Sequence, residues 1–322
     1  CVKTSVCAVV VTFQPDQGGL ATLLEALRPQ VDALVLVDNG SNQPELLHDL
    51  AANFDSQLIL LEENQGIARA QNLGIALAFE QGFDAVLLSD QDSIPSAGMV
   101  AQLVRTLVGA SKPDPFFPAA GNLLPSFTSE ASKPIAAVGP VPVDERGSEE
   151  SALVYSFTTW GPKRRTIPQA GEVLEVPFVL ASGCLIPRDA LLNVGPMNES
   201  LFIDHVDLAW CLRALEKGYR ILVDGSAKLT HSLGEEKTVL PTGREIHVQS
   251  PMRNSYVVRN TMWLTRAPFM PTLWKLGYLP YLAKYLGFYS LLSLKQPSRF
   301  KELCRGFEDG LRGASGPSSP SP

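Results

Sequence analysis

Two aspartates one residue apart are the residues of this chain best suited to do chemistry. Asp90 and Asp92 lie in the segment LSDQDS, directly after the apolar run 85–88. Carboxylates this close repel each other unless a cation lies between them, and Mg²⁺ or Mn²⁺ clamped to a diphosphate is the usual cation. The alternative is a turn that ends a strand and caps the next helix. Whether the pair is a metal site or a turn must be inferred from the neighbouring segments.

The first 110 residues alternate apolar runs with segments of helical periodicity. Continuous apolar runs are typical of parallel strands buried on both faces, and their alternation with helices predicts a doubly wound sheet. Ligands bind beyond the carboxyl ends of such strands. Thr12, Asp38 and the Asp90/Asp92 pair follow three of these runs, so we expect them at one edge of the sheet. The expected strands are 6–13, 33–37, 57–61 and 85–88, and the expected helices are 20–27, 44–52 and 66–80.

The rest of the chain divides into a less regular part and a helical part. Residues 111–175 are rich in proline and glycine and predict loops with short strands at 137–143 and 152–158. Further on we expect a strand at 176–187, a helix at 208–217, strands at 219–223 and 228–233, and helices from residue 251. We therefore expect a domain over 1–243, divided at residue 110, a basic helical region over 244–312, and a disordered low-complexity tail over 313–322.

Charge is distributed unevenly along the 322 residues. The net charge is −6, but residues 244–312 hold 11 Lys/Arg against 4 Asp/Glu, a net of +7. Their basic residues alternate with aliphatic runs, which disfavours nucleic acid as a partner and favours an anionic surface. For the apolar segment 276–294, Pro280 and Lys284 argue against a membrane span, and an in-plane helix or a packed core helix is expected instead.

The cysteines and the start of the chain indicate a reducing compartment. Cysteines 1, 7, 184, 211 and 304 show no metal-binding spacing, and most lie in apolar sequence, so we expect reduced, buried thiols of a cytoplasmic protein. The first 13 residues show no signal-peptide pattern and predict a strand.

Six segments in order carry a resemblance to a known family. They are VVVTF, VDNGS, ENQGIARAQNLGI, LLSDQD, ASGCLIPR, and LFIDHVDLAWCLRALEKGYR, the last followed by His231. Together they resemble family 2 inverting glycosyltransferases of the GT-A fold, and DQDS with FIDHVD is similar to bacterial rhamnosyltransferases. The resemblance covers about residues 5–265. It implies a Rossmann-like, mostly parallel α/β sheet flanked by helices, with a C-terminal helical appendage.

The resemblance also implies roles on the donor side of the site. Asp92 would coordinate Mg²⁺ or Mn²⁺, and Asp90 would contact the ribose or a metal-bound water. Asp38 would accept a hydrogen bond from the base, although Asp-Asn-Gly is also strong turn chemistry. The list of further donor-side candidates is Thr12 and Phe13 beside the base, Arg69 on the diphosphate or base, and His231 on the metal.

Position 205 departs from the family pattern on the acceptor side. Similar enzymes carry Glu-Asp where this chain has Asp204-His205. The general base is therefore Asp204 if the mechanism needs a carboxylate, or His205 if the role transfers by position. Asp207 would support the site from the first turn of the following helix. Ser182 and Gly183 would line the sugar or acceptor pocket.

The function expected from these residues is inverting, metal-assisted glycosyl transfer. The resemblance implies L-rhamnose as the sugar, dTDP-L-rhamnose as the donor, and a surface glycan, lipopolysaccharide or lipid-linked acceptor at the cytoplasmic face of an inner membrane. The same family could use another UDP- or dTDP-sugar. Nucleotidyl transfer is disfavoured because no Lys or Arg precedes Arg28 after the first strand, and a non-catalytic binding protein is disfavoured by the intact Asp pair.

Overall fold

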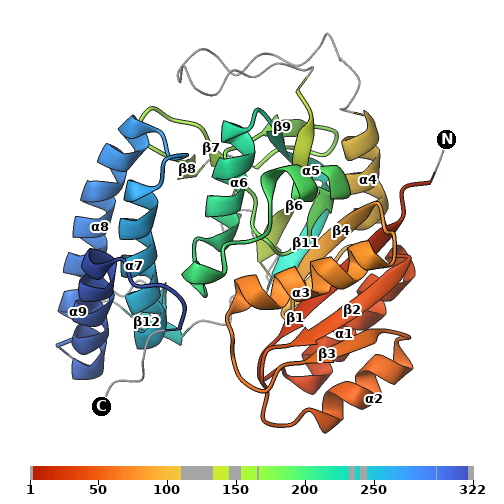
Figure 1. Ribbon diagram of the computed structural model, residues 1–322, viewed down its shortest axis with the longest axis horizontal. Helices are drawn as coiled ribbons and strands as arrows, with labels where there is room; N and C mark the ends of the chain where they lie inside the picture. The colour runs from red at the N-terminus through yellow and green to blue at the C-terminus, as the bar shows by residue number, and fades with distance from the viewer. Residues whose placement is uncertain are drawn as a thin grey trace.

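In the structure, a computed structural model, a central sheet is covered by helices on both faces, and three C-terminal helices form a layer at one side (Figure 1). The sheet order is β3-β2-β1-β4-β10-β6-β11-β5, with β9 paired to β11. The GT-A-type fold expected from the sequence is thus confirmed. The described residues are 3–109, 133–144, 154–164, 167–231, 236–239, 245–294 and 296–317.

The first half of the sheet is parallel, as its continuous apolar runs predict. Strands β3, β2, β1 and β4 pair side by side in one direction, so their carboxyl ends meet at one edge. Asp16 caps the first helix by accepting from the Gly19 N–H. The elements are β1 (Val6–Thr12), α1 (Gln17–Leu27), η1 (Arg28–Gln30), β2 (Ala33–Asp38), α2 (Glu45–Asn53), β3 (Gln57–Leu60), α3 (Ile67–Glu80) and β4 (Ala85–Asp90).

The second half of the sheet is mixed, which qualifies the expectation of a mostly parallel sheet. Strand β10 runs antiparallel to β4 and β6, β11 is parallel to β6, and β5 and β9 are antiparallel to β11. The elements are β5 (Ser93–Pro95), α4 (Met99–Gly109), β6 (Ile135–Asp144), β7 (Tyr155–Ser156), β8 (Lys163–Arg164), β9 (Val173–Glu175), β10 (Cys184–Pro187), α5 (Arg188–Val194), η3 (Glu199–Leu201), α6 (Val206–Glu216), β11 (Arg220–His231), β12 (Glu236–Val239) and β13 (Glu245–Val248).

Strand β1 shows why the sheet is buried on both faces. Alternate side chains point to opposite faces of a strand. Cys7, Val9 and Val11 enter the core shared with α3, α5 and α6. Val6, Ala8 and Val10 enter the core shared with α1, α2 and α4. A strand buried on both faces holds its terminal residues at a fixed place, so the polar residues that follow it are rigidly positioned.

The C-terminal layer has a small core of its own. Helices α7 (Pro251–Arg266), α8 (Thr272–Leu292) and α9 (Pro297–Arg312) pack together around Val258, Leu282 and Leu303. In Figure 1, α7 lies between α8 and the sheet. Among the described residues we find no helix with the length and hydropathy needed to cross a bilayer.

Several elements differ from the sequence-based expectation. The strand expected at 176–187 is regular only over β10. Instead of the two strands expected at 219–223 and 228–233, one strand, β11, runs to His231 with an irregularity near Asp224, and residues 232–233 lie outside the described residues. Cys304 is exposed, whereas the other described cysteines are buried and all four are free. The start of the expected disordered tail is held, because Gly316 donates to the Ser200 carbonyl oxygen at 2.7 Å.

Candidate functional site

The ends of β1 and β2 form a buried hydrogen-bonded corner. Asp38 is 1% exposed, and its carboxylate accepts from Thr12 Oγ1 at 2.9 Å and from both the N–H and the Oγ of Ser41, at 2.8 and 2.6 Å. The bond from Ser41 N–H is the turn that Asp-Asn-Gly predicts. Because a carboxylate offers about four acceptor positions, one position is left for a further donor. The turn is therefore present, and the hydrogen bond between Asp38 and a base stays a prediction.

Gln91, the residue between the two aspartates, joins β4 to β1. Its Oε1 accepts from the Phe13 N–H at 2.7 Å, and its Nε2 donates to the Phe13 carbonyl oxygen at 3.1 Å. The Phe13 side chain itself is 42% exposed. This amide pairs with the backbone of Phe13 as a neighbouring strand would. It keeps residues 90–92, here called the aspartate turn, next to the end of β1.

Ser182 holds the aspartate turn in place through hydrogen bonds. It is 5% exposed, and its Oγ accepts from the Asp90 N–H at 3.1 Å and lies 2.8 Å from Ser93 Oγ. At Gly183 (φ +74°), an added Cβ would lie 2.8 Å from the side chain of Pro140. The expected sugar-pocket roles of Ser182 and Gly183 remain predictions, while the contacts seen here are structural ones.

The backbone brings His231 to the aspartate turn. In the antiparallel pairing of β5 and β11, His231 lies opposite Ser93, the residue after Asp92. His231 comes 139 residues after Asp92 in the sequence, and this strand pairing places its backbone beside the residue that follows Asp92.

The donor set suits a metal whose remaining ligands come from the substrate. No three His, Cys, Asp or Glu side chains of the described residues form a metal cage by themselves. Mg²⁺ is commonly bound by one or two carboxylates together with substrate phosphates. Asp90, which is partly exposed, and Asp92, which is exposed, provide such carboxylates.

The start of α3 touches the acceptor loop, which we define as residues 202–205. Asn64 accepts from the Nδ2 of Asn39 at 2.9 Å and from the Gly66 N–H at 2.9 Å. Gly66 has φ +89°, and an added Cβ would lie 2.6 Å from the Phe202 carbonyl oxygen, which accepts from the Ile67 N–H at 2.8 Å. Only glycine fits at this close approach, so the donor and acceptor sides are in direct contact.

Arg69 lies in the first turn of α3, as predicted, but it has a carboxylate partner. Its Nη1 is 3.3 Å from Glu199 Oε1, and the two side chains are 44% and 42% exposed. Asn72 donates to the same carboxylate at 2.8 Å. The diphosphate or base contact predicted for Arg69 would have to compete with Glu199.

The acceptor loop has an unusual backbone. Phe202, Asp204 and His205 have φ values of 64°, 61° and 62°. Non-glycine residues with positive φ cost about 1–3 kcal/mol each and persist only where the surroundings enforce them. This strain directly precedes α6, at the place where the sequence predicted the general base.

Helix α7 provides the partners of both candidate bases. Arg253 forms a two-pronged ion pair with Asp204, with distances of 2.5 Å (Nη2–Oδ1) and 3.3 Å (Nε–Oδ2). His205 Nε2 lies 3.0 Å from the Oγ1 of Thr261, which is fully buried. Burial lowers the pKa of His205, and the Asp204 charge partly opposes this shift. His205 is therefore a neutral imidazole at neutral pH.

Asn260 and Arg259 hold the backbone of the same loop. Asn260 is fully buried, and its Nδ2 donates to the carbonyl oxygens of Leu201, Ile203 and Asp204 at 2.9, 2.7 and 3.0 Å. Arg259, 2% exposed, donates to the Leu201 carbonyl oxygen at 2.9 Å. The polar groups of these two residues are therefore buried against the loop and hold its backbone in place.

The carboxyl group of Asp207 has a raised pKa. Burial raises its pKa to about 6, a hydrogen bond from the Leu208 N–H partly opposes the shift, and the charges of Asp90 and Asp204 raise it further. Asp90 at the end of β4 and Asp204 beside His205 are therefore near enough to Asp207 for their charges to raise its pKa. A group with a pKa near 6 can both take and release a proton near neutral pH.

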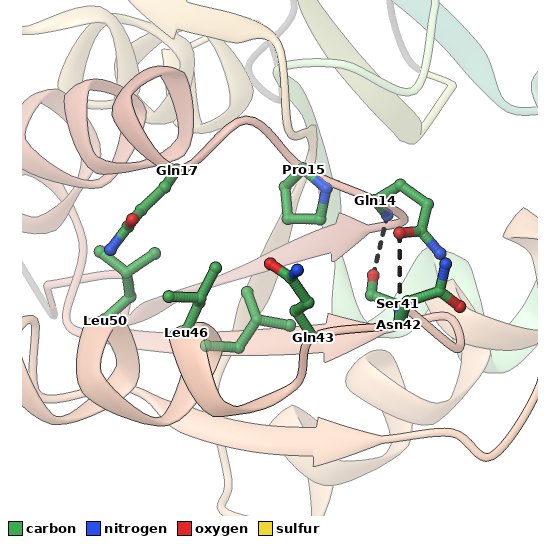
Figure 2. Close-up of a pocket in the computed structure, with 9 residues that line it drawn as sticks. Gln14, Pro15, Gln17, Ser41, Asn42, Gln43, Leu46 and Leu50 are labelled. Atoms are coloured by element: carbon green, nitrogen blue, oxygen red, sulfur yellow. Dashed lines mark hydrogen bonds between the residues drawn. The ribbon is translucent and has the colours of Figure 1, made fainter.

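The ends of β1, β2 and β4, with Thr12, Asp38 and Asp90, are here called the donor corner. A pocket of about 240 Å³ borders it (Figure 2). It lies between the segments that follow β1 and β2 and the first turns of α2. Gln14 joins its two rims, donating from its N–H to Ser41 Oγ at 2.8 Å and accepting from the Asn42 N–H at 3.4 Å. Its lining comprises Gln14, Pro15, Gln17, Ser41, Asn42, Gln43, Leu46, Leu47 and Leu50.

Sequence reasoning missed the residues that hold the candidate groups in place. Gln91 could have been noticed because it separates two candidate metal ligands. Ser41 has the spacing of an Asx turn after Asp38. The contact between Arg253 and Asp204 spans 49 residues and has no local signal.

Comparisons of the sequence identify the class of protein. Residues 7–111 match the glycosyl transferase family 2. The chain is 28% identical over 315 residues to the dTDP-rhamnosyl transferase RfbF of Shigella flexneri, with 98% of each chain covered. It is also 26% identical over 199 residues to the poly-beta-1,6-N-acetyl-D-glucosamine synthase of Staphylococcus aureus, covering 61% of this chain but only 42% of the synthase.

Solved structures show the same fold at low sequence identity. TarS of S. aureus, residues 1–349, matches with a TM-score of 0.56 and 13% identity over 95% of this chain and 80% of its own. GalNAc-T7, solved with UDP, GalNAc and Mn²⁺, matches with a TM-score of 0.54 and 12% identity over 96% of this chain and 56% of its own. The family 2 match over residues 7–111 and the full-length similarity to a dTDP-rhamnosyl transferase together support a glycosyltransferase of family 2, with a rhamnosyltransferase among the relatives of this chain.

Proposed function

We propose that the chain transfers L-rhamnose from dTDP-L-rhamnose, with inversion, to a hydroxyl of a glycan or lipid-linked acceptor. The full-length similarity to a dTDP-rhamnosyl transferase is the observation that carries this choice of donor. Lipopolysaccharide or another surface polysaccharide is the acceptor class that we propose, at the cytoplasmic face of an inner membrane.

The donor nucleotide would bind at the strand ends. The remaining acceptor position on Asp38 is suited to the N3–H of thymine or uracil, with Thr12 and Phe13 beside the base. Asp90 would face the ribose or the diphosphate. The contacts of Gln91 and Ser182 fix this edge before the donor arrives, so that little ordering remains to be done on binding.

Asp92, with Asp90 and the nearby His231, would hold a divalent metal. When bound, Mg²⁺ or Mn²⁺ would neutralise charge on the departing diphosphate. The carboxylates of Asp90 and Asp92 would supply the negative charge that attracts the cation.

Asp207 is the group we propose for removing the acceptor proton. Its pKa of about 6 makes it a stronger base than an ordinary carboxylate and leaves it ionised at neutral pH. Asp204 was the carboxylate favoured by sequence, and it stays a candidate, but its ion pair with Arg253 occupies both oxygens. His205, the third candidate, has its Nε2 engaged by Thr261.

One experiment tests the donor and the metal together. Purified protein is incubated with dTDP-rhamnose, UDP-glucose or UDP-GlcNAc, in Mg²⁺, Mn²⁺ or EDTA, and release of the nucleoside diphosphate is measured. We expect turnover with dTDP-rhamnose that is lost in EDTA and restored by either metal. Preference for a UDP-sugar would reject rhamnose but keep the family. Full turnover in EDTA would reject the metal.

A further inference from the structure

Helix α8 is apolar on two opposite sides, but the protein covers only one of them. Its inward side chains, such as Trp274, Leu282 and Tyr289, are buried. The opposite side, here called the outer face, carries large apolar side chains that are between 37% and 82% exposed. The outer face consists of Leu273, Leu276, Leu279, Phe288, Leu291 and, just past the helix end, Leu294.

These exposed residues form a stripe and not a scatter. Leu273, Leu276, Leu291 and Leu294 recur at spacings that return to one side of an α-helix. A helix of 21 residues is about 30 Å long, so the stripe is long as well. Single exposed leucines are ordinary, whereas a contiguous apolar surface marks an interaction site. In Figure 1, α8 lies at the outer edge of the molecule, on the side of α7 away from the sheet.

The only charged residues within α8 are two lysines, Lys275 and Lys284. Residues 246–301 contain eight Lys/Arg and no Asp or Glu, but Arg259 and Arg299 are buried and Arg253 pairs with Asp204. Lys284 is exposed near the middle of the outer face. A lysine can lay its aliphatic stem along an apolar surface while its ammonium group reaches outward. The surface therefore offers apolar contact together with positive charge.

Helix α9 adds a second exposed apolar stripe. Phe300, Phe307 and Leu311 are 50%, 39% and 58% exposed, at spacings of seven and four residues that share one side of the helix. Lys301, also exposed, lies beside this stripe. Two of the three helices of the C-terminal layer thus present apolar side chains outward, and the α9 stripe is flanked by exposed charges of both signs, Lys301 and Glu308.

We propose that the outer face of α8 docks on a bilayer of anionic phospholipid, with the helix axis in the membrane plane. The leucines would enter the boundary between headgroups and acyl chains, and Lys284 would approach the headgroup phosphates. A second copy of the chain fits less well, because two outer faces would bring lysines together with no carboxylate on α8 to match them. This inference does not depend on which sugar is transferred.

The test is co-sedimentation of the full chain with vesicles of phosphatidylglycerol or of phosphatidylcholine. We expect binding to phosphatidylglycerol that weakens in high salt. The double variant L276S/L291S should bind about tenfold or more weakly because two exposed anchors are removed. Lys284→Glu should weaken binding roughly tenfold at low salt. Leu192→Ser, at a leucine of α5 that is 66% exposed, is the matched control and should bind as the parent chain does.

Each other outcome counts against the proposal. Circular dichroism and dTDP binding first show that the variants are folded. A parent chain that ignores phosphatidylglycerol, or a folded double variant that binds as well as the parent, overturns the docking. If the double substitution instead converts a dimer to a monomer without vesicles, measured by sedimentation, the outer face belongs to a second copy of the chain.

Discussion

The donor corner and the acceptor loop are built in opposite ways. At the donor corner, Asp38 and Asp90 end parallel strands, and the carboxylate of Asp38 is held by the adjacent strand and turn. In the acceptor loop, Asp204 and His205 have left-handed backbones, and their partners on α7 come 49 and 56 residues later. The donor corner therefore needs only the sheet, whereas the acceptor loop needs a helix from the C-terminal layer.

This difference separates what a substitution can damage. A change at the sheet edge removes a chemical group and leaves the frame in place. A change on α7 leaves every candidate catalytic group present but releases the strained loop that carries two of them. Donor binding and transfer rate should therefore respond separately to the two kinds of change.

Asp92→Asn should give the largest effect at the donor corner. It removes charge from the proposed metal site at an exposed position, so the rate of rhamnose transfer should fall about 10³-fold while the melting temperature stays nearly unchanged. Initial rates and thermal unfolding measure the two effects. Unchanged turnover in Asp92→Asn would reject the metal assignment.

Asp207→Asn tests the proposed base. Loss of a general base should lower the rate about 10²-fold or more. In the parent protein, the rate should rise with pH through about 6 as Asp207 loses its proton. If Asp204→Asn slows transfer far more than Asp207→Asn while dTDP binding is kept, the base is Asp204.

The same substitution should change stability in a defined direction. The pKa of Asp207 is raised from 3.8 to about 6, so its effect on stability is most favourable below pH 3.8 and is lost as pH rises through 6. In metal-free buffer, Asp207→Asn should therefore raise the melting temperature at pH 8 and change it little at pH 4. An equal change at both pH values would mean that Asp207 is not buried as described.

Arg253→Met should separate the two regions most clearly. It leaves Asp204 without its ion-pair partner, so the acceptor loop should loosen and the transfer rate should fall about tenfold to 10²-fold. Binding of dTDP, measured by calorimetry, should stay within about twofold of the parent because the donor corner is not touched.

Arg253→Lys is the matched control for this substitution. Lysine restores the charge but not the two-pronged geometry, so its rate should lie between those of the parent and Arg253→Met. If Arg253→Met weakens dTDP binding as much as it slows transfer, α7 supports both regions and the separation is wrong.

The sequence predicted the donor corner in more detail than the acceptor loop. Thr12, Asp38 and Asp90 were placed at one edge because apolar runs of strand length end in polar residues, and the runs themselves carry that information. Their mutual proximity then follows from the parallel pairing of β1 with β2 and β4.

The acceptor loop could be located but not described. FIDHVD gave its position in the chain, but nothing local in it predicts three positive φ angles, because bulky residues rarely adopt them. The loop is imposed by Asn260 and Arg253, whose role depends on where α7 packs. For α8 the sequence left two alternatives open, a packed core helix and an in-plane helix. In the structure one side of α8 is packed and the other is exposed.

The smallest effect on stability should come from the salt bridge between Arg69 of α3 and Glu199 of η3. Arg69 and Glu199 are both more than 40% exposed, so Glu199→Gln should change the free energy of unfolding by less than about 1 kcal/mol. The glutamine oxygen can still accept from Asn72, while Arg69 becomes free to approach an anion. If Arg69 contacts the donor diphosphate, Glu199→Gln should tighten dTDP binding about twofold to threefold at low salt, and Arg69→Gln should weaken it. If neither substitution alters dTDP affinity, Arg69 only joins α3 to η3, and the donor corner holds the diphosphate without it.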